Sequence, residues 1–287
     1  MYNILVTGSK GQLGSEIRAI TSSSSNTYFY TDVAELDITD KNAVNRYVKD
    51  YKINIVINCA AYTQVDKAED DEEKAYLINA TAAENLAVVC AQNSATLFHI
   101  STDYVFSGNS SLPYTETDLT TPLGVYGKSK RKAEELILQS RCRYLIFRTA
   151  WLYSSYGSNF VKTIGRLSGE KDELKVVFDQ VGSPTYAADL ASTIVQLINN
   201  ESFIERDGIY HFSNEGVCSW YDFAIAINQF FENRCRIKPC HSDEFPSKVT
   251  RPHFSVLDKT KIKRDFEIEI PYWRDSLERC INLIRQV

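Results

Sequence analysis

A tyrosine and a lysine lie four residues apart in the stretch Tyr126-Gly127-Lys128-Ser129-Lys130. On a helix, residues at this spacing share one face, so the lysine ammonium can lie beside the phenol. A free tyrosine has a pKa of roughly 10, and a neighbouring cation brings its proton within reach of chemistry near neutral pH. Because the chain has 17 tyrosines, roughly one such spacing is expected by chance. The surrounding elements must therefore decide whether this pair is an acid or a solvated helix face.

Composition indicates a globular protein that binds a small ligand. The chain has 287 residues, is 44% hydrophobic and carries a formal charge of -5, so it can bury a core in one large or two modest domains. The charge is not gathered into basic blocks, and no segment reaches the roughly 18 apolar residues of a membrane span, which argues against nucleic-acid and membrane partners. The seven cysteines form no Cys-x-x-Cys pair, and we expect reduced thiols in a cytoplasmic protein.

The N-terminal segment has the pattern of a dinucleotide site. A buried strand over 3–7 is followed by a glycine-rich turn and then by a helical segment. The glycines permit a tight turn and a close approach of the backbone to a pyrophosphate, which would rest on the helix N-terminus. The candidate cofactor-binding residues of this turn are Gly8, Lys10, Gly11, Gln12, Leu13 and Gly14.

The next strand, 27–31, ends at Asp32. A carboxylate there suits the ribose hydroxyls of NAD and repels the extra phosphate of NADP, whereas Lys10 in the glycine turn could offset that repulsion. We therefore expect NADH or NADPH as cofactor without a choice between them. Asp37 and Ile38 follow and are placed near the adenine, while Asp40 is interpreted as the cap of a helix that begins at Lys41.

Two further strands end in residues that suit a ligand. Strand 54–58 leads into Cys59, Ala60, Ala61 and Tyr62, whose small residues let a cofactor lie against the backbone. Strand 96–100 leads into Ser101 and Thr102, and a hydroxyl there can hydrogen-bond a substrate oxygen or only cap the strand end. Within the long helix predicted over 73–92, Asn79 is either a cofactor contact or a hydrogen-bonded core residue.

Alternating strands and helices predict an α/β fold with a doubly wound parallel sheet. We expect the cofactor-binding domain over 1–150, with a helix near 186–199 returning to it. A smaller discontinuous α/β domain over 151–287 is predicted to bind the substrate, and it would contain the strand at 209–212 and the helices at 220–231 and 273–284.

Eight motifs in register resemble the extended short-chain dehydrogenase/reductase family, and within it the dTDP-4-dehydrorhamnose reductase group. They are Leu5-Val6-Thr7-Gly8 with Gly11-Gln12-Leu13-Gly14, Leu36-Asp37-Ile38-Thr39, Asn58-Cys59-Ala60-Ala61-Tyr62-Thr63, Ser101-Thr102-Asp103-Tyr104-Val105-Phe106, Tyr126-Gly127-Lys128-Ser129-Lys130, Arg148-Thr149-Ala150-Trp151, Gly182-Ser183-Pro184-Thr185 and Arg251-Pro252. Each motif is weak alone, but together they span nearly the whole chain.

The resemblance implies a Rossmann-like fold and reduction of the 4-keto group of a dTDP-sugar by NADH or NADPH, in the synthesis of rhamnose for cell-surface polysaccharides. It implies that Tyr126 is the general acid, that Lys130 holds the nicotinamide ribose and lowers the tyrosine pKa, and that Thr102 hydrogen-bonds the ketone. It places Val65, Asp103 and Trp151 at the sugar, although Trp151 also fits a core aromatic.

Several points stay open at this level. Arg251 suits a diphosphate, for which its planar fork of donors is adapted, but it also suits an exposed surface. Glu16 matches a glutamate through which some relatives hold a cation at a dimer contact; the other ligands cannot be assembled, so we expect no required metal, with Mg²⁺ at a homodimer contact as an option.

Other functions on the same scaffold are a nucleotide-sugar epimerase or dehydratase, or a non-catalytic NADP-binding regulatory subunit such as that of methionine adenosyltransferase. A dehydratase normally places an Asp-Glu pair after the threonine, whereas Thr102 is followed here by Asp103 and Tyr104.

Overall fold

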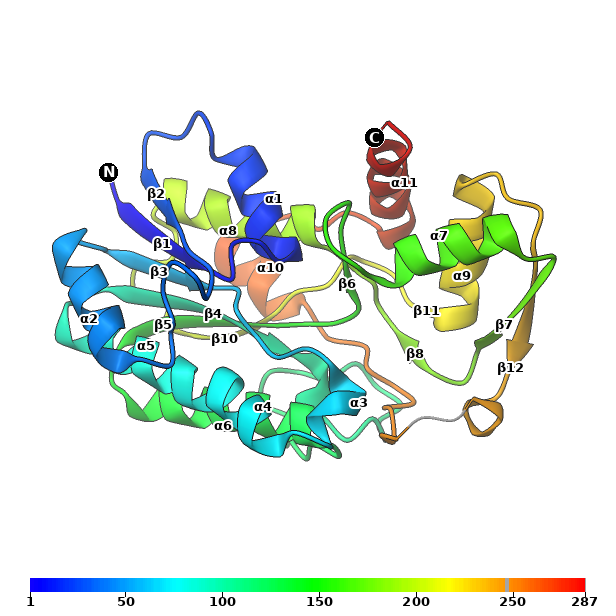
Figure 1. The fold of residues 1–287 in the computed structure, drawn as a ribbon, viewed down its shortest axis with the longest axis horizontal. Coiled ribbons are helices and arrows are strands. Elements are labelled where there is room, and N and C mark those ends of the chain that lie inside the picture. Colours follow the sequence, from blue (N-terminus) through cyan, green and yellow to red (C-terminus); the bar gives the residue numbers. More distant parts are fainter. Residues whose placement is uncertain (246–247, 287) are drawn as a thin grey trace.

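The computed structural model describes residues 1–245 and 248–286 and is built around a six-stranded sheet with the order β10-β5-β4-β3-β1-β2 (Figure 1). Neighbouring strands are parallel throughout. The strands are β1 (Asn3–Thr7), β2 (Thr27–Tyr30), β3 (Ile55–Asn58), β4 (Thr96–Thr102), β5 (Arg143–Thr149) and β10 (Gly208–His211). The strand order turns back beside β1, so β1 and β3 frame the switch point where such sheets bind ligands.

Strand residues alternate between the two faces of this sheet, and each face carries its own core. Ile4 and Val6 of β1 belong to one apolar cluster, whereas Leu5 belongs to the other. Helices α2 (Lys41–Asp50), α5 (Ala82–Gln92) and α6 (Val125–Gln139) cover the Leu5 face, and α1 (Gln12–Ile20), α8 (Ala187–Asn199) and α10 (Thr260–Phe266) cover the opposite face. The fold is therefore the predicted Rossmann-like, doubly wound α/β architecture.

The long helix predicted over 73–92 is present but interrupted. It consists of α4 (Glu72–Tyr76), a π-helical turn (Leu77–Thr81) and α5. π-helical turns are rare and are frequent at functional sites. This one carries Ile78, which lines a cavity described below, and the buried Asn79. The predicted helix cap is confirmed, because Asp40 Oδ1 accepts hydrogen bonds from the backbone N–H groups of Asn42 and Ala43.

A second, smaller region packs beside the carboxyl ends of the strands (Figure 1). Its core joins aromatic and aliphatic side chains of three helices, among them Val161, Phe223, Trp273 and Leu277. The elements are α7 (Phe160–Glu170), β7 (Glu173–Val177), α9 (Trp220–Phe230), β12 (Arg236–Cys240) and α11 (Trp273–Ile284), with the short strands β6 (Leu152–Tyr153), β8 (Val181–Gly182), β9 (Thr185–Tyr186) and β11 (Cys218–Ser219). β7 and β12 pair in parallel, which gives this region its own two-stranded sheet.

One element was assigned to the wrong region. The strand predicted at 209–212 exists as β10, but it extends the central sheet by pairing with β5 and does not belong to the smaller region. The reason is packing: Tyr210 and Phe212 belong to the same apolar cluster as the α8 residues Leu190 and Ile194. A short, partly polar strand does not reveal its neighbours by its sequence, because pairing is decided by distant residues.

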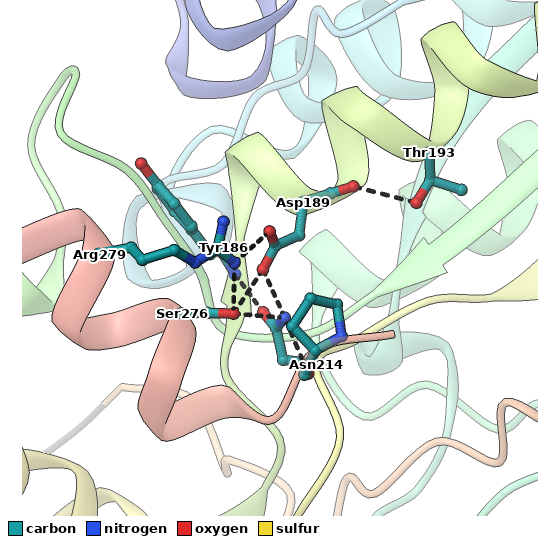
Figure 2. Close-up of polar contacts among 7 residues, drawn as sticks. Tyr186, Asp189, Thr193, Asn214, Ser276 and Arg279 are labelled. Atoms are coloured by element: carbon teal, nitrogen blue, oxygen red, sulfur yellow. Dashed lines mark hydrogen bonds and ion pairs between the residues drawn. The ribbon is translucent and has the colours of Figure 1, made fainter. Parts of the chain in front are cut away.

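A buried polar network joins the two regions at α8 and α11 (Figure 2). Asp189 Oδ2 accepts hydrogen bonds from Asn214 Nδ2 at 2.7 Å and from Ser276 Oγ at 2.6 Å. Asn214 Oδ1 in turn accepts from the backbone N–H of Tyr186 at 2.7 Å. Arg279 closes the network with a 2.5 Å bond to Asp189 Oδ1. These satisfied buried groups fix how the second region sits on the sheet.

No helix among the described residues is both long and apolar enough to cross a lipid bilayer.

Candidate functional site

The turn after β1 is shaped by glycines that leave no room for a side chain. Gly8 has a φ of +61°, and a Cβ placed there would lie 2.6 Å from the backbone nitrogen of Ala60. A Cβ on Gly14 would lie 2.6 Å from the carbonyl oxygen of Gly8. Helix α1 follows with Gly11 at its N-cap and no capping side chain, so its first N–H groups point out of the turn without a side-chain acceptor. An anion such as a pyrophosphate suits such a cradle.

A cavity of about 280 Å³ opens between this turn and the ends of β2 and β3. Its lining includes predicted cofactor-binding residues from four separate segments of sequence, namely Gly8, Gly11, Asp32, Asp37, Ile38, Cys59, Ala60 and Ala61. Leu36, Thr39 and Ile78 also line it, although we did not select them from the sequence. The cavity is apolar in its walls and acidic at the mouth, which suits an adenosine and its ribose.

The other predicted cofactor residues lie outside this cavity. Lys10 does not line the cavity; its Nζ forms an ion pair with Glu35 at 2.9 Å. Leu13 is buried in the core, and Gln12 accepts a hydrogen bond from Asn159. Asn79 is fully buried and clamps Tyr62, accepting from its N–H at 2.8 Å and donating to its carbonyl at 3.1 Å. Asn79 therefore holds the wall of the site in place.

Tyr126 and Thr102 come together at the end of β4. The phenol is buried, and burial raises its pKa to about 12, while a hydrogen bond with the Thr102 side chain acts in the opposite direction. At neutral pH the tyrosine is thus a protonated donor whose oxygen meets a second hydroxyl. The Thr102 hydroxyl donates to Asp103 Oδ1 at 3.0 Å, so Tyr126 and Thr102 can both donate to one substrate oxygen once that oxygen replaces Asp103 as the acceptor.

Asp103 and Tyr104 directly follow Thr102 and belong to the 3₁₀ turn Asp103–Val105. Burial raises the pKa of Asp103 to about 6, although hydrogen bonds from Ser255 and Thr102 oppose the shift. The Tyr104 ring packs edge-on against Tyr126 with ring centres 5.6 Å apart. A carboxylate, two phenols and a threonine hydroxyl therefore share one small polar space.

Lys130 lies one turn after Tyr126 on α6, as the spacing predicts, but its amine is directed elsewhere. Nζ donates to the carbonyl oxygen of Ile100 at 2.6 Å and lies 3.2 Å from Nε2 of His99. The prediction that Lys130 lowers the Tyr126 pKa is not supported, because the groups that shift this pKa are the burial itself, Thr102 and Asp103. The physical reason is that β4 offers the amine a closer acceptor than the phenol.

Trp151 has an unusual backbone φ angle, and its ring packs against Trp220 and close to Gly182. It has a φ of +49°, outside the usual range of a tryptophan. Its ring stacks on Trp220 with centres 3.6 Å apart, and a Cβ on Gly182 would lie 2.8 Å from Cε2 and Cζ2 of the indole. A strained backbone that packing maintains is typical of a functional position.

Arg251 approaches the same space from the second region. Its Nη2 pairs with Asp66 at 3.1 Å, and its charge partly opposes the rise that burial causes in the pKa of Tyr104, which places Arg251 near that phenol. Nε of Arg251 is buried and finds no hydrogen-bond partner in the described part of the chain. Val65 begins the short helix α3 (Val65–Ala68) that carries Asp66. Arg251 thus has a donor to spare for an anionic ligand.

Comparison with known proteins identifies the family. The sequence model described as "RmlD substrate binding domain" matches residues 2–286. The dTDP-4-dehydrorhamnose reductase of Aggregatibacter actinomycetemcomitans is 40% identical, over 97% of this chain and 98% of that protein. The chain belongs to the RmlD family. Its fold is also that of solved members, since a dTDP-4-dehydrorhamnose reductase ortholog from Clostridium acetobutylicum superposes with a TM-score of 0.94 at 41% identity, with 99% of each chain covered.

A second solved member of the RmlD family bears on the cofactor. The dTDP-4-dehydrorhamnose reductase of Bacillus anthracis, solved in complex with NADP, has a TM-score of 0.94 and 38% identity, over 98% of this chain and 99% of that one. The glycine cradle and the cavity described above fit an NAD(P) cofactor.

Some residues of this RmlD family site were missed at the sequence level. The most buried are His99 and the ion pair of Glu134 with Arg148, whose Nη2–Oε2 distance is 2.8 Å. Ser101 donates to Glu134 Oε1 at 2.6 Å, so β4 directs both His99 and Ser101 at α6. The signal was the alternation of polar residues at 99 and 101 in an otherwise apolar strand, which places both on one face.

Glu16, the glutamate that the family resemblance linked to a cation, is buried in this structure and accepts a 2.6 Å hydrogen bond from Ser154. Burial raises its pKa, and the charge of Asp189 acts in the same direction. The described residues contain no group of three or more His, Cys, Asp or Glu side chains arranged to hold a metal ion.

Proposed function

We propose that this protein uses NADPH or NADH to reduce the 4-keto group of dTDP-4-dehydro-L-rhamnose, giving dTDP-L-rhamnose. The observation that carries the proposal is the buried Tyr126 phenol, protonated at neutral pH and hydrogen-bonded to Thr102. It lies in a chain that matches proteins named dTDP-4-dehydrorhamnose reductase over nearly its full length. A ketone needs this kind of donor, because negative charge builds on its oxygen as it is reduced.

A bound nicotinamide cofactor would supply the hydride, because protein side chains do not donate one. Its pyrophosphate suits the cradle of Gly8, Gly11 and Gly14, where added Cβ atoms would close the space. Its adenosine suits the cavity between Asp32, Ile38 and the small residues 59–61. Lys130 would hold the nicotinamide ribose by its amine.

The protein's own contribution to the chemistry is placement and a proton. Thr102 and Tyr126 together hydrogen-bond the ketone oxygen, which orients the carbonyl and stabilises the developing alkoxide. Tyr126 then gives its proton to that oxygen, so the phenolate forms only as the alcohol does. Burial of the site strengthens these hydrogen bonds by excluding water.

The substrate side is assigned to the space between the two regions. Trp151 offers an apolar face to the deoxy sugar, and Val65 borders it from α3. Asp103 accepts hydrogen bonds from sugar hydroxyl groups, and Arg251 meets the diphosphate with its unpartnered Nε. On this assignment, residues 1–150 with α8 and β10 bind the cofactor, and most of 151–287 binds the nucleotide sugar. A cytoplasmic location and a homodimer are compatible with this role and belong to the same proposal.

The deciding experiment is an assay of the purified protein with NADPH and dTDP-4-dehydrorhamnose, followed at 340 nm, with the product identified by NMR. We expect sugar-dependent oxidation of NADPH and dTDP-L-rhamnose as product. Turnover of other nucleotide sugars but not this one would replace the substrate, and interconversion without net NADPH loss would indicate an epimerase. NADPH binding without turnover of any nucleotide sugar would favour a regulatory subunit.

A further inference from the structure

His99 is a buried titratable group that the proposed chemistry does not use. It is completely shielded from solvent in the middle of β4. Its Nε2 lies 3.2 Å from Lys130 Nζ, and its Nδ1 lies 3.1 Å from Asn58 Nδ2. The imidazole therefore bridges the end of β3 and the lysine of the site.

The orientation of the Asn58 amide is fixed by its other contacts. Its Oδ1 accepts from the backbone N–H of Ala60 at 3.2 Å and from the Thr7 hydroxyl at 2.7 Å. A backbone N–H can only donate, so the oxygen of the amide must face Ala60 and the NH₂ group must face His99. Turning the amide over would set two donors against each other at Ala60.

This orientation determines which nitrogen of His99 carries the proton. Because the Asn58 NH₂ donates to Nδ1, Nδ1 must be an acceptor and the proton of the neutral ring lies on Nε2. The Nε2–H then points at Lys130 Nζ. A neutral amine can accept this bond with its lone pair while donating to the carbonyl of Ile100, whereas an ammonium has only donors to offer.

The charges around Lys130 act in both directions. Burial lowers its pKa to about 8, and the carboxylate of Glu134 one turn later on α6 opposes that shift. Burial also lowers the pKa of His99 well below its ordinary value, and the Lys130 charge adds to this, so the ring stays neutral. The ionisable groups that act on the amine are therefore His99 on β4 and Glu134 on α6, and Glu134 is itself paired with Arg148 of β5 at 2.8 Å.

We propose that Asn58 and His99 are positioning residues that direct an N–H at Lys130 Nζ, favour the amine over the ammonium there, and make cofactor binding take up a proton. The inference rests on the proposed role of Lys130 at the cofactor ribose. If Lys130 holds the cofactor ribose, the ribose hydroxyl oxygens would accept from the amine and the negative charge of the cofactor would favour the ammonium. One proton from solvent then forms the additional N–H bond at Nζ, and no bond in the protein is broken.

The test is a count of the protons taken up when NADPH binds to the intact protein. Calorimetric titration in two buffers of different ionisation enthalpy at pH 8.5 gives this number, and the NADPH 2′-phosphate is already fully ionised there. With a pKa of about 8, roughly three quarters of the amine is neutral at that pH, so we expect uptake of about half a proton or more. At pH 6.5 the amine already carries its proton, and the uptake should fall close to zero.

Three variants separate this role from a structural one. In His99→Gln the side-chain carbonyl can accept from an ammonium, and in Asn58→Asp the carboxylate accepts from Nδ1–H, which turns the Nε2 lone pair toward Lys130. Both changes should abolish the uptake at pH 8.5 and move the basic limb of kcat/KM from about pH 8 to higher pH. The matched control is His211→Gln: His211 is equally buried but bonds to Arg148 and the carbonyl of Tyr114. It should leave the proton count unchanged.

The possible outcomes separate the positioning role of Asn58 and His99 from the proposed reductase function. Wild-type protein that binds NADPH without proton uptake at pH 8.5 would overturn the role of Asn58 and His99 and leave the cofactor site intact. The same follows if His99→Gln and Asn58→Asp keep the uptake, or if His211→Gln loses it equally. Wild-type protein that does not bind NADPH at all overturns the proposed function, and the inference with it. If His99→Gln does not fold, Asn58→Asp carries the comparison, since all its hydrogen bonds can be satisfied.

Discussion

The protonation state of Tyr126 depends on its burial, on Thr102 and on Asp103 more than on Lys130. Burial keeps the phenol protonated, with a pKa of about 12, and the Thr102 hydroxyl is the group that hydrogen-bonds it. Asp103, with a pKa raised to about 6, adds a nearby negative charge at neutral pH that also disfavours the phenolate. A protonated tyrosine in this setting can donate its proton to an acceptor stronger than the Thr102 hydroxyl. A ketone oxygen that develops negative charge is such an acceptor.

The residue-scale prediction separates the two members of the pair. Tyr126→Phe removes only the hydroxyl, so we expect NADPH to bind within about twofold of wild type while kcat falls by roughly 10²- to 10⁴-fold, the usual contribution of a general acid. Lys130→Ala should weaken NADPH binding as well, because it removes a donor to the ribose. Fluorescence titration with NADPH and steady-state kinetics measure the two quantities. Equal loss of NADPH affinity in both variants would contradict the division of roles.

At the scale of elements, the sequence predicted those features that depend on local pattern. The strands predicted over 3–7, 54–58 and 96–100 are present as β1, β3 and β4, because short apolar β-branched runs end in glycine or small polar residues, and their carboxyl ends meet at one edge of the sheet. The pocket residues Asp32, Ile38 and Ala60 followed from that edge. These inferences need no knowledge of distant contacts.

What the sequence could not supply were pairings between distant segments. β10 joins β5 across 63 residues at Tyr210 and Phe147, and nothing local in β10 indicates this neighbour. The direction of the Lys130 amine was missed for the same reason, because it depends on a carbonyl of β4 and on His99. Spacing on a helix fixes which face a side chain leaves from, but not which acceptor it reaches.

The element-scale prediction concerns the stacking of β11–α9 on the segment after β5. Trp220, the first residue of α9, stacks on Trp151, and Gly182 of β8 lies close to the Trp151 indole. Trp220→Ala should free the Trp151 ring and raise KM for the nucleotide sugar about three- to tenfold, the range of a lost aromatic contact of roughly 0.5–1.5 kcal/mol. NADPH affinity should not change, because the stack lies away from the glycine turn.

Two substitutions serve as comparisons for the tryptophan stack. Trp220→Phe keeps an aromatic surface and should restore most of the lost sugar affinity. Phe160→Leu removes another ring that packs on Trp220, with centres 4.5 Å apart, without touching Trp151 directly. If Phe160→Leu and Trp220→Ala raise KM alike, general loosening of the second region would explain both, and the specific role of Trp220 would be lost.

At the scale of the whole molecule, two ion pairs connect the second region to the segment around α3. Arg251 pairs with Asp66, and Lys248 pairs with Asp70 at 2.6 Å. They differ in setting: Lys248 and Asp70 are both more than 60% exposed, whereas Arg251 is 37% exposed with its Nε buried. Exposed pairs contribute little to stability, so neither is expected to hold the regions together alone. The buried network of Asp189, Asn214 and Ser276 at the opposite end does so (Figure 2).

Because this ion pair adds little to stability, the proposed diphosphate contact of Arg251 can be tested without unfolding the protein. Arg251→Ala should raise KM for dTDP-4-dehydrorhamnose by roughly 10- to 100-fold, as expected for the loss of charge-assisted hydrogen bonds to a diphosphate, while the NADPH dissociation constant and the melting temperature stay close to wild type. Arg251→Lys keeps the charge but not the planar fork and should recover only part of the affinity. Lys248→Ala is the matched control, because it breaks a neighbouring ion pair of the same kind and should leave KM unchanged. An equal rise of KM in both alanine variants would mean that Arg251 acts by joining the regions, and the diphosphate would then need another ligand.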